Sequence, residues 1–228
     1  MQGEAKVAEL SLVGGRPSAH ISCESSAVPE PGRYLLAHEA GSDAPLATEL
    51  FAAEYRSHGF VAAPPVPPAW LPGAVLDIRG PLGNGFVMPP GARRVALIAF
   101  NEDPAPLLPL VGAAVRQAAA VALVCANPPP ELPLHVEVHP PPALMDVCMW
   151  SDYAAFHLER RSVDALLRSL VEGRGPVCGG DAQALVRTSM PCGGLADCGV
   201  CTVKTKNGPQ LACVEGPVFD LGSLILES

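Results

Sequence analysis

The placement of the cysteines constrains this chain more than any other feature of its sequence. Five of the eight lie in the last quarter of the 228 residues, namely Cys178, Cys192, Cys198, Cys201 and Cys213. The N-terminal residues lack the pattern of a signal peptide, and no apolar run is long enough to span a membrane. We therefore expect a cytoplasmic protein with reduced thiols, so the late cysteines need an explanation other than disulfides.

Four of these cysteines have a spacing typical of a metal centre. Five residues separate Cys192 from Cys198, two separate Cys198 from Cys201, and eleven separate Cys201 from Cys213. In plant-type 2Fe-2S ferredoxins about four residues, then two and then a longer interval separate the ligands, so the spacing here differs by one residue. We predict that Cys192, Cys198, Cys201 and Cys213 hold a 2Fe-2S cluster and that Cys178 is structural.

The residues between these cysteines suit an anionic cluster. Four thiolates, two ferric ions and two sulfides give a net charge of about −2, which reduction makes about −3. Gly193, Gly194 and Gly199 let the backbone wrap closely, so that N–H groups can point at the sulfurs. Lys204 and Lys206 add positive charge nearby.

Zinc is the alternative metal for this segment. A zinc ribbon normally uses two Cys-x-x-Cys pairs or histidine ligands. The segment has one such pair, Cys198 and Cys201, and no histidine close to it. A structural or assembly protein with a zinc site therefore stays open as a hypothesis.

The end of the chain resembles the cluster module of the electron-transfer subunit of dihydroorotate dehydrogenase. Members of that family end with a 2Fe-2S loop, a short hairpin, the fourth cysteine and a Gly-Pro-x-Phe-Asp segment, which here reads Gly216-Pro217-Val218-Phe219-Asp220. The resemblance implies an accessory subunit of an oxidoreductase that relays electrons from a flavoprotein partner. That partner would be a dihydroorotate dehydrogenase catalytic subunit of pyrimidine biosynthesis.

The resemblance also implies a fold similar to that of ferredoxin reductases, mixed β and α/β. It has a flavin-type β-barrel over residues 1–88, an α/β nucleotide-type domain over 89–175 and a 2Fe-2S module over 176–228. Two segments support the barrel: 31–36 resembles the family's Pro-Gly-x-Tyr strand, and 80–86 resembles its Gly-Pro-x-Gly-x-Gly-Phe closing element.

The hydrophobic pattern agrees with this order of domains. Short strands separated by Pro and Gly are predicted over 7–13, 20–23, 33–38, 60–63 and 75–78. A strand over 94–100, a helix over 107–119 and a strand over 121–125 form a βαβ unit. An amphipathic helix over 163–171 is expected to close the α/β domain, with one apolar face formed by Leu166, Leu167, Leu170 and Val171.

The family's flavin motif is missing. Members of the family bind the flavin with a strand that carries Arg-Pro-x-Ser, but the corresponding stretch 42–50 has no arginine. Asp43 and Glu49 would face the pyrophosphate there, which is electrostatically unfavourable. We read Gly80-Pro81-Leu82-Gly83 as a tight barrel turn rather than a flavin contact. A complete FAD and 2Fe-2S reductase subunit is the alternative.

The glycine-rich phosphate loop of nicotinamide-binding relatives is also missing. After the strand over 94–100 the chain carries Glu102 and Asp103 where the phosphates would lie, and Asp103 is predicted to cap a helix instead. This predicts an α/β domain that does not bind NAD.

The net charge and the placement of the histidines argue against a nucleic-acid-binding protein and against an enzyme with a histidine-activated nucleophile. The net charge of −8 and a pI near 5.2 argue against nucleic acid as a partner. The six histidines are dispersed, and none belongs to a recognisable nucleophile motif. We therefore predict no catalytic residue.

Overall fold

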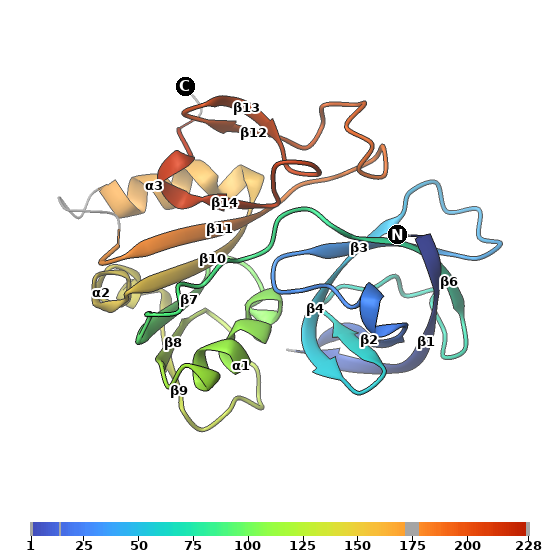
Figure 1. Ribbon diagram of the computed structural model, residues 1–228, viewed down its shortest axis with the longest axis horizontal. Helices are drawn as coiled ribbons and strands as arrows, with labels where there is room; N and C mark the ends of the chain where they lie inside the picture. Colours follow the sequence, from blue (N-terminus) through green and yellow to red (C-terminus); the bar gives the residue numbers. More distant parts are fainter. Residues whose placement is uncertain (1, 14, 172–177, 227–228) are drawn as a thin grey trace.

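The computed structural model describes residues 2–13, 15–171 and 178–226, which form two lobes (Figure 1). The first lobe is a closed barrel with the strand order β1-β2-β5-β4-β3-β6. Its strands are β1 (Gln2–Val13), β2 (Arg16–Ser22), β3 (Tyr34–Glu39), β4 (Thr48–Arg56), β5 (Gly59–Ala62) and β6 (Val75–Leu82). This confirms the predicted β-barrel.

The barrel closes around its own apolar core. Side chains of successive strand residues alternate between the two faces, so each strand sends every second residue inward. The inward set includes fully buried Ile21, Leu35, Leu50, Phe60 and Leu76. Burial of these side chains holds the strands in register.

The second lobe is a six-stranded sheet in the order β14-β11-β10-β7-β8-β9. Strands β7 to β11 pair in parallel, and β14 pairs antiparallel at one edge. The strands are β7 (Arg94–Ala99), β8 (Ala120–Val124), β9 (Val136–His139), β10 (Tyr153–Glu159), β11 (Asp181–Arg187) and β14 (Val218–Asp220). The helices are α1 (Pro109–Arg116), α2 (Leu144–Trp150) and α3 (Val163–Val171).

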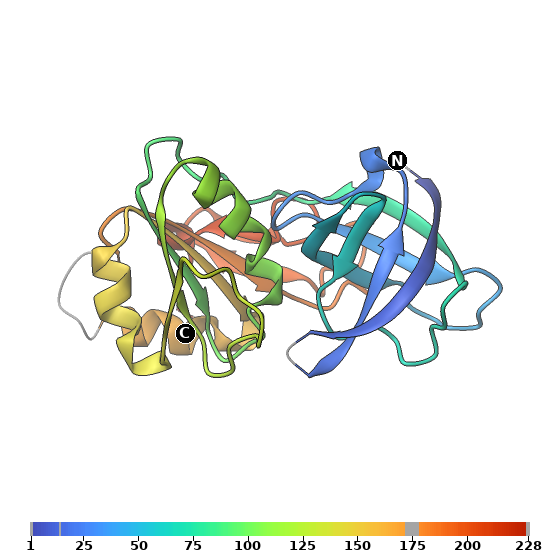
Figure 2. The ribbon, with the colours of Figure 1, turned by 90° about the horizontal axis from the view of Figure 1, so that it is seen from below.

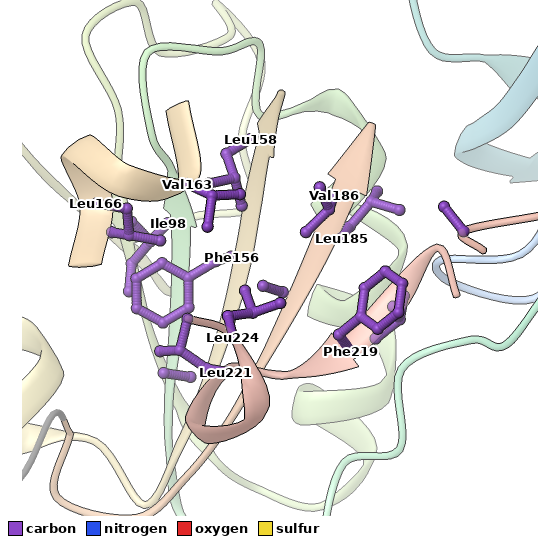
Figure 3. Close-up of a cluster of buried hydrophobic side chains, with 14 of the residues drawn as sticks. Ile98, Phe156, Leu158, Val163, Leu166, Leu185, Val186, Phe219, Leu221 and Leu224 are labelled. Carbon is purple, nitrogen blue, oxygen red and sulfur yellow. The ribbon is translucent and has the colours of Figure 1, made fainter. Parts of the chain in front are cut away.

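Helices cover both faces of this sheet (Figure 2). Leu110 and Val111 of α1 pack on one face, whereas Leu166 and Leu170 of α3 pack on the other with α2. Figure 3 shows this second face, where Phe156 of β10 lies among side chains from α3 and from the C-terminal segment. The end of the chain is therefore part of the α/β core.

Short 3-10 turns connect several elements. They span Ser25–Ala27, Ala105–Leu107, Pro141–Ala143, Arg160–Ser162 and Leu221–Ser223. Asp103 accepts a hydrogen bond from the Ala105 N–H at 2.8 Å. The N-caps of the turn and of α1 are nevertheless Pro104 and Leu108, both without a side-chain cap, so the prediction that Asp103 caps a helix is wrong. A separate hairpin of β12 (Thr202–Thr205) and β13 (Gly208–Leu211) projects from the sheet.

The structure differs from the sequence predictions in several places, and β9, α2 and β10 also lie where no element was expected. Strand β4 was not among the expected strands, because its Glu and Ala residues lack a strict alternation and a bulge lies between Ala52 and Glu54. Helix α1 is shorter than predicted. Strands β11 and β14 join the sheet of the α/β lobe, although both fall after the expected boundary at 175/176, which itself lies outside the described residues.

No helix among the described residues is long and apolar enough to cross a membrane.

Candidate metal centre

The four predicted ligands lie on the loop after β11 and on the hairpin that follows it. Cys192 and Cys198 lie on the loop, Cys201 immediately precedes β12, and Cys213 follows β13. The hairpin register places Thr202 opposite Leu211, and the Ala212 N–H donates to the Cys201 carbonyl at 3.0 Å. The hairpin thus brings Cys213, which is separated from Cys201 by eleven residues, back beside Cys201.

The four thiols form two pairs. Cys192 and Cys198 hydrogen-bond to each other, and so do Cys201 and Cys213. Cys192 is close enough to Cys213 to raise the pKa of that thiol. Within the described ranges, no three His, Cys, Asp or Glu side chains gather as the ligands of one ion would. A two-iron cluster needs two thiolates on each iron, and a donor set of two thiol pairs fits that requirement.

Backbone amides point at the sulfurs, as the glycine-rich loop predicts. The N–H groups of Leu195, Asp197 and Cys198 donate to the Cys192 thiol and, with the Cys198 thiol, lower its pKa to about 6. The Ala196 N–H donates to Cys213. Burial and the neighbouring Cys201 nevertheless raise the pKa of Cys213 to about 11. The loop therefore supplies donors for negatively charged sulfur.

An arginine of the barrel supplies positive charge to the loop. The Arg79 guanidinium, on β6, donates to the Gly193 carbonyl. Lys204 and Lys206, which the sequence suggested for this role, are exposed on the hairpin. Nothing in the spacing around Arg79 marks it, apart from a charged residue among the apolar residues of a strand.

The fifth cysteine of the segment lies elsewhere. Cys178 is buried and hydrogen-bonds to Cys148 of α2. It therefore packs in the α/β core, and a structural role stays the prediction for it.

The Gly-Pro-x-Gly element of the barrel, residues 80–83, is held by hydrogen bonds and leads to a contact with the end of the chain. Arg33 donates from Nε to the Gly83 carbonyl at 3.0 Å and from Nη2 to the Pro81 carbonyl at 3.1 Å. These bonds fix the turn that follows β6. The turn then meets the Gly-Pro segment that resembles the family's C-terminal signature.

We call residues 81–84 and 215–217 the barrel–tail junction. Asn84 donates from its backbone N to the Gly216 carbonyl at 2.6 Å and from Nδ2 to the Glu215 carbonyl at 2.8 Å. A Cβ on Gly83 would lie 2.5 Å from Pro217 and 2.7 Å from the Gly216 carbonyl oxygen. The junction fixes the tail that follows the fourth cysteine against the barrel.

A cavity of about 570 Å³ lies between the barrel, the carboxyl ends of β10 and β11, and the cysteine loop. Four arginines from three segments line it: Arg16, Arg160, Arg161 and Arg187. Three acids line it as well: Glu49, Glu102 and Glu159. Of the two acids expected to face a flavin pyrophosphate, Glu49 lines this cavity and Asp43 is exposed outside its lining, while the four arginines come from segments distant from 42–50.

Most of these arginines already have partners. Their partners are Asp103 for Arg16 (3.8 Å), Glu159 for Arg161 (2.5 Å), and the carbonyls of Val200 and Thr202 for Arg160 (2.8 and 3.0 Å). Arg187 lies 5.3 Å from the centre of the Phe51 ring. Arg160 thus ties the cysteine loop to the α/β lobe.

The raised pKa of Glu49 predicts that the stability of the fold depends on pH. Partial burial raises its pKa from 4.5 to about 7, against the opposing effects of Arg187 and of the Met190 N–H. A raised folded-state pKa stabilises the fold below about pH 4.5, and this contribution is lost as the pH rises through about 7. Replacing Glu49 by Gln should therefore raise the free energy of unfolding at about pH 8.5 by roughly 1–3 kcal/mol more than at about pH 5.5.

Urea unfolding of both proteins at the two pH values measures this difference. A Glu131→Gln variant, at an exposed position, serves as the control and should show no such change between the two pH values. Equal effects of Glu49→Gln at both pH values would contradict the assigned shift.

The comparisons with known proteins agree with this geometry. Residues 188–225 match the family model described as the iron-sulfur cluster binding domain of dihydroorotate dehydrogenase B. No curated protein matches the sequence.

Two reductases are among the solved structures with a similar fold. An NADH-dependent reduced ferredoxin-NADP oxidoreductase, described in work on flavin-based electron bifurcation, is 16% identical with a TM-score of 0.69 over 97% of this chain and 89% of that one. A ferredoxin NADP+ reductase from Neisseria gonorrhoeae with bound FAD and NADP is 12% identical with a TM-score of 0.56, over 81% and 98%. Residues 188–225 are thus similar to an iron-sulfur cluster binding domain, and the chain as a whole has a ferredoxin-reductase-like fold.

Proposed function

We propose that the chain is a cytoplasmic electron-transfer subunit in which Cys192, Cys198, Cys201 and Cys213 hold a 2Fe-2S cluster. The observation that carries this proposal is the arrangement of the four thiols in two pairs, with backbone amides aimed at Cys192 and Cys213. When bound, the cluster supplies one-electron transfer. The protein's own part is to orient the thiolates, partly exclude water and dock a partner.

The contacts of the cysteine loop also indicate how the chain is divided into parts. We infer a barrel over 1–88 and an α/β lobe that carries β14 besides β7 to β11. The cysteine loop and hairpin lie between these lobes. Arg79 attaches the loop to the barrel, and Arg160 attaches it to the α/β lobe. Because the loop is held from both lobes, its cysteine ligands keep their positions when the charge of the cluster changes on reduction.

We infer that the electron-donating partner docks over Cys198. This thiol is exposed, whereas Cys201 and Cys213 are buried. Leu195 and Val200 flank it and are 59% and 43% exposed. Neighbouring exposed apolar side chains are typical of an interaction site. The partner we propose is a flavoprotein, a dihydroorotate dehydrogenase catalytic subunit of pyrimidine biosynthesis.

Metal analysis combined with electron paramagnetic resonance tests the cluster directly. Purified protein should contain about two irons per chain and give the signal of a reduced 2Fe-2S centre after dithionite. Zinc without iron and without a signal would contradict the proposal and favour a structural protein.

The arginine-lined cavity favours a second candidate, a complete FAD and 2Fe-2S reductase subunit. Arg187 and Thr188 line that cavity, and the Thr188 hydroxyl has no hydrogen-bond partner in the described part of the chain. Denaturing the protein and measuring the released flavin by fluorescence separates the two candidates. About one flavin per chain would support the reductase, and its absence would support an accessory subunit that takes electrons from a partner's flavin.

A further inference from the structure

Tyr34 carries a buried hydroxyl to which the proposed function assigns no part. The residue begins β3, is 0% exposed and belongs to the same core cluster as Cys201 and Cys213. Among the residues that the structure describes, its Oη has no hydrogen-bond partner. A buried hydroxyl without a partner costs folding free energy, so a partner from outside the chain would explain its presence.

The hydroxyl lies against the cysteine loop. A Cβ built on Gly194 would lie 3.3 Å from Tyr34 Oη and 3.2 Å from Arg79 Nη2, so the loop passes there without room for a side chain. Gly194 has a φ of +70°, which glycine adopts at little cost. The hydroxyl is therefore on the side of the loop that faces the barrel.

Two of the four predicted ligands are close to this hydroxyl. Burial raises the pKa of Tyr34, and the Cys213 thiol, the Glu49 carboxylate and the Cys201 thiol raise it further, so these groups lie within electrostatic reach of the hydroxyl. A tyrosine hydroxyl is in any case protonated at neutral pH, so it is available as a donor. Its ring is held by Phe51, with the two ring centres 5.7 Å apart.

We propose that Tyr34 Oη donates a hydrogen bond to a sulfur of the bound cluster on the Cys201 and Cys213 side, and thereby raises the cluster's reduction potential. This inference rests on the proposed function. One electron from the partner flavoprotein adds one negative charge to the centre, and the proton stays on Tyr34. A fixed donor in a buried site stabilises the more negative, reduced state more than the oxidised state. Tyr34 is thus a positioning and tuning residue rather than a ligand.

The test compares Tyr34→Phe with Tyr153→Phe in the full chain. Phenylalanine keeps the ring and removes only the hydroxyl. Tyr153 is equally buried, but its hydroxyl donates to Gln183 Oε1 at 2.7 Å within the α/β lobe, which makes it a matched control. A redox titration followed by electron paramagnetic resonance measures the midpoint potential of each protein.

We expect Tyr34→Phe to lower the equilibrium constant for one-electron reduction about tenfold, a shift of about 59 mV to more negative potential. Iron content and the potential of Tyr153→Phe should stay at the wild-type values. An unchanged potential in Tyr34→Phe would overturn the inference. Loss of the cluster in Tyr34→Phe alone would overturn it too, because the hydroxyl would then serve assembly. A wild-type protein without a cluster would instead refute the proposed function.

Discussion

Replacing Cys201 by Ser is expected to remove the visible absorption of the cluster and its electron paramagnetic resonance signal. Cys201 is 1% exposed, and its thiol hydrogen-bonds to Cys213. A serine hydroxyl is a poor iron ligand at neutral pH, because it does not ionise as a thiol does. Loss of a ligand should reduce the iron content per chain at least about tenfold, because replacing residues that only orient the ligands already lowers metal affinity by about that factor.

Two variants control for nonspecific damage in this experiment. Cys23→Ser changes a half-buried thiol beyond the end of β2, and Cys178→Ala changes the fifth late cysteine, which pairs with Cys148. Both should retain the spectrum. Retention of the full spectrum by Cys201→Ser would refute the ligand assignment. Bleaching by Cys178→Ala, with the fold intact by circular dichroism, would move a ligand to that position.

The sequence could predict the parts of the molecule that depend on local patterns. The spacing of Cys192, Cys198 and Cys201 is a property of one short loop, and the hairpin after Cys201 needs only the turn within Lys206-Asn207-Gly208-Pro209. The barrel and the βαβ unit follow from strands with clear apolar runs. These elements appear in the structure with shifts at their ends.

The parts that could not be predicted are assembled from distant segments. The arginine-lined cavity takes Arg16 from β2 and Arg187 from the end of β11, so no single stretch of sequence marks it. Arg79 is likewise a barrel residue that contacts the cysteine loop from 114 residues away. The stretch 42–50 by itself therefore predicts an acidic site, whereas both arginine and glutamate side chains line the folded cavity.

The same limit applies to the two Gly-Pro segments. Each resembles a family signature, and nothing in either segment shows that the two pack together. The structure joins them at the barrel–tail junction, where Asn84 binds the carbonyls of Glu215 and Gly216. The turn after β6 therefore holds the tail behind the fourth cysteine, which gives this element a structural purpose that does not require a flavin.

Replacing Gly83 by Ala should break this junction and destabilise the whole chain. The new Cβ would lie 2.5 Å from Pro217 Cδ and 2.7 Å from the Gly216 carbonyl oxygen, and Gly83 has a φ of +72°. Overpacking against the backbone and the left-handed conformation together should cost about 3–5 kcal/mol of unfolding free energy. Urea denaturation followed by circular dichroism measures this loss, and the visible spectrum of the native protein reports whether the cluster stays bound.

Gly41→Ala separates the two causes of that loss. Gly41 has a nearly equal φ of +75°, but nothing lies within 4 Å of the position that a Cβ would take there. Backbone strain alone should therefore cost Gly41→Ala about 1–2 kcal/mol. The excess loss in Gly83→Ala measures the contact between barrel and tail. Equal losses in the two variants would mean that the barrel and the tail are not coupled through this junction, and the cysteine loop would then depend on Arg79 and Arg160 alone for its position.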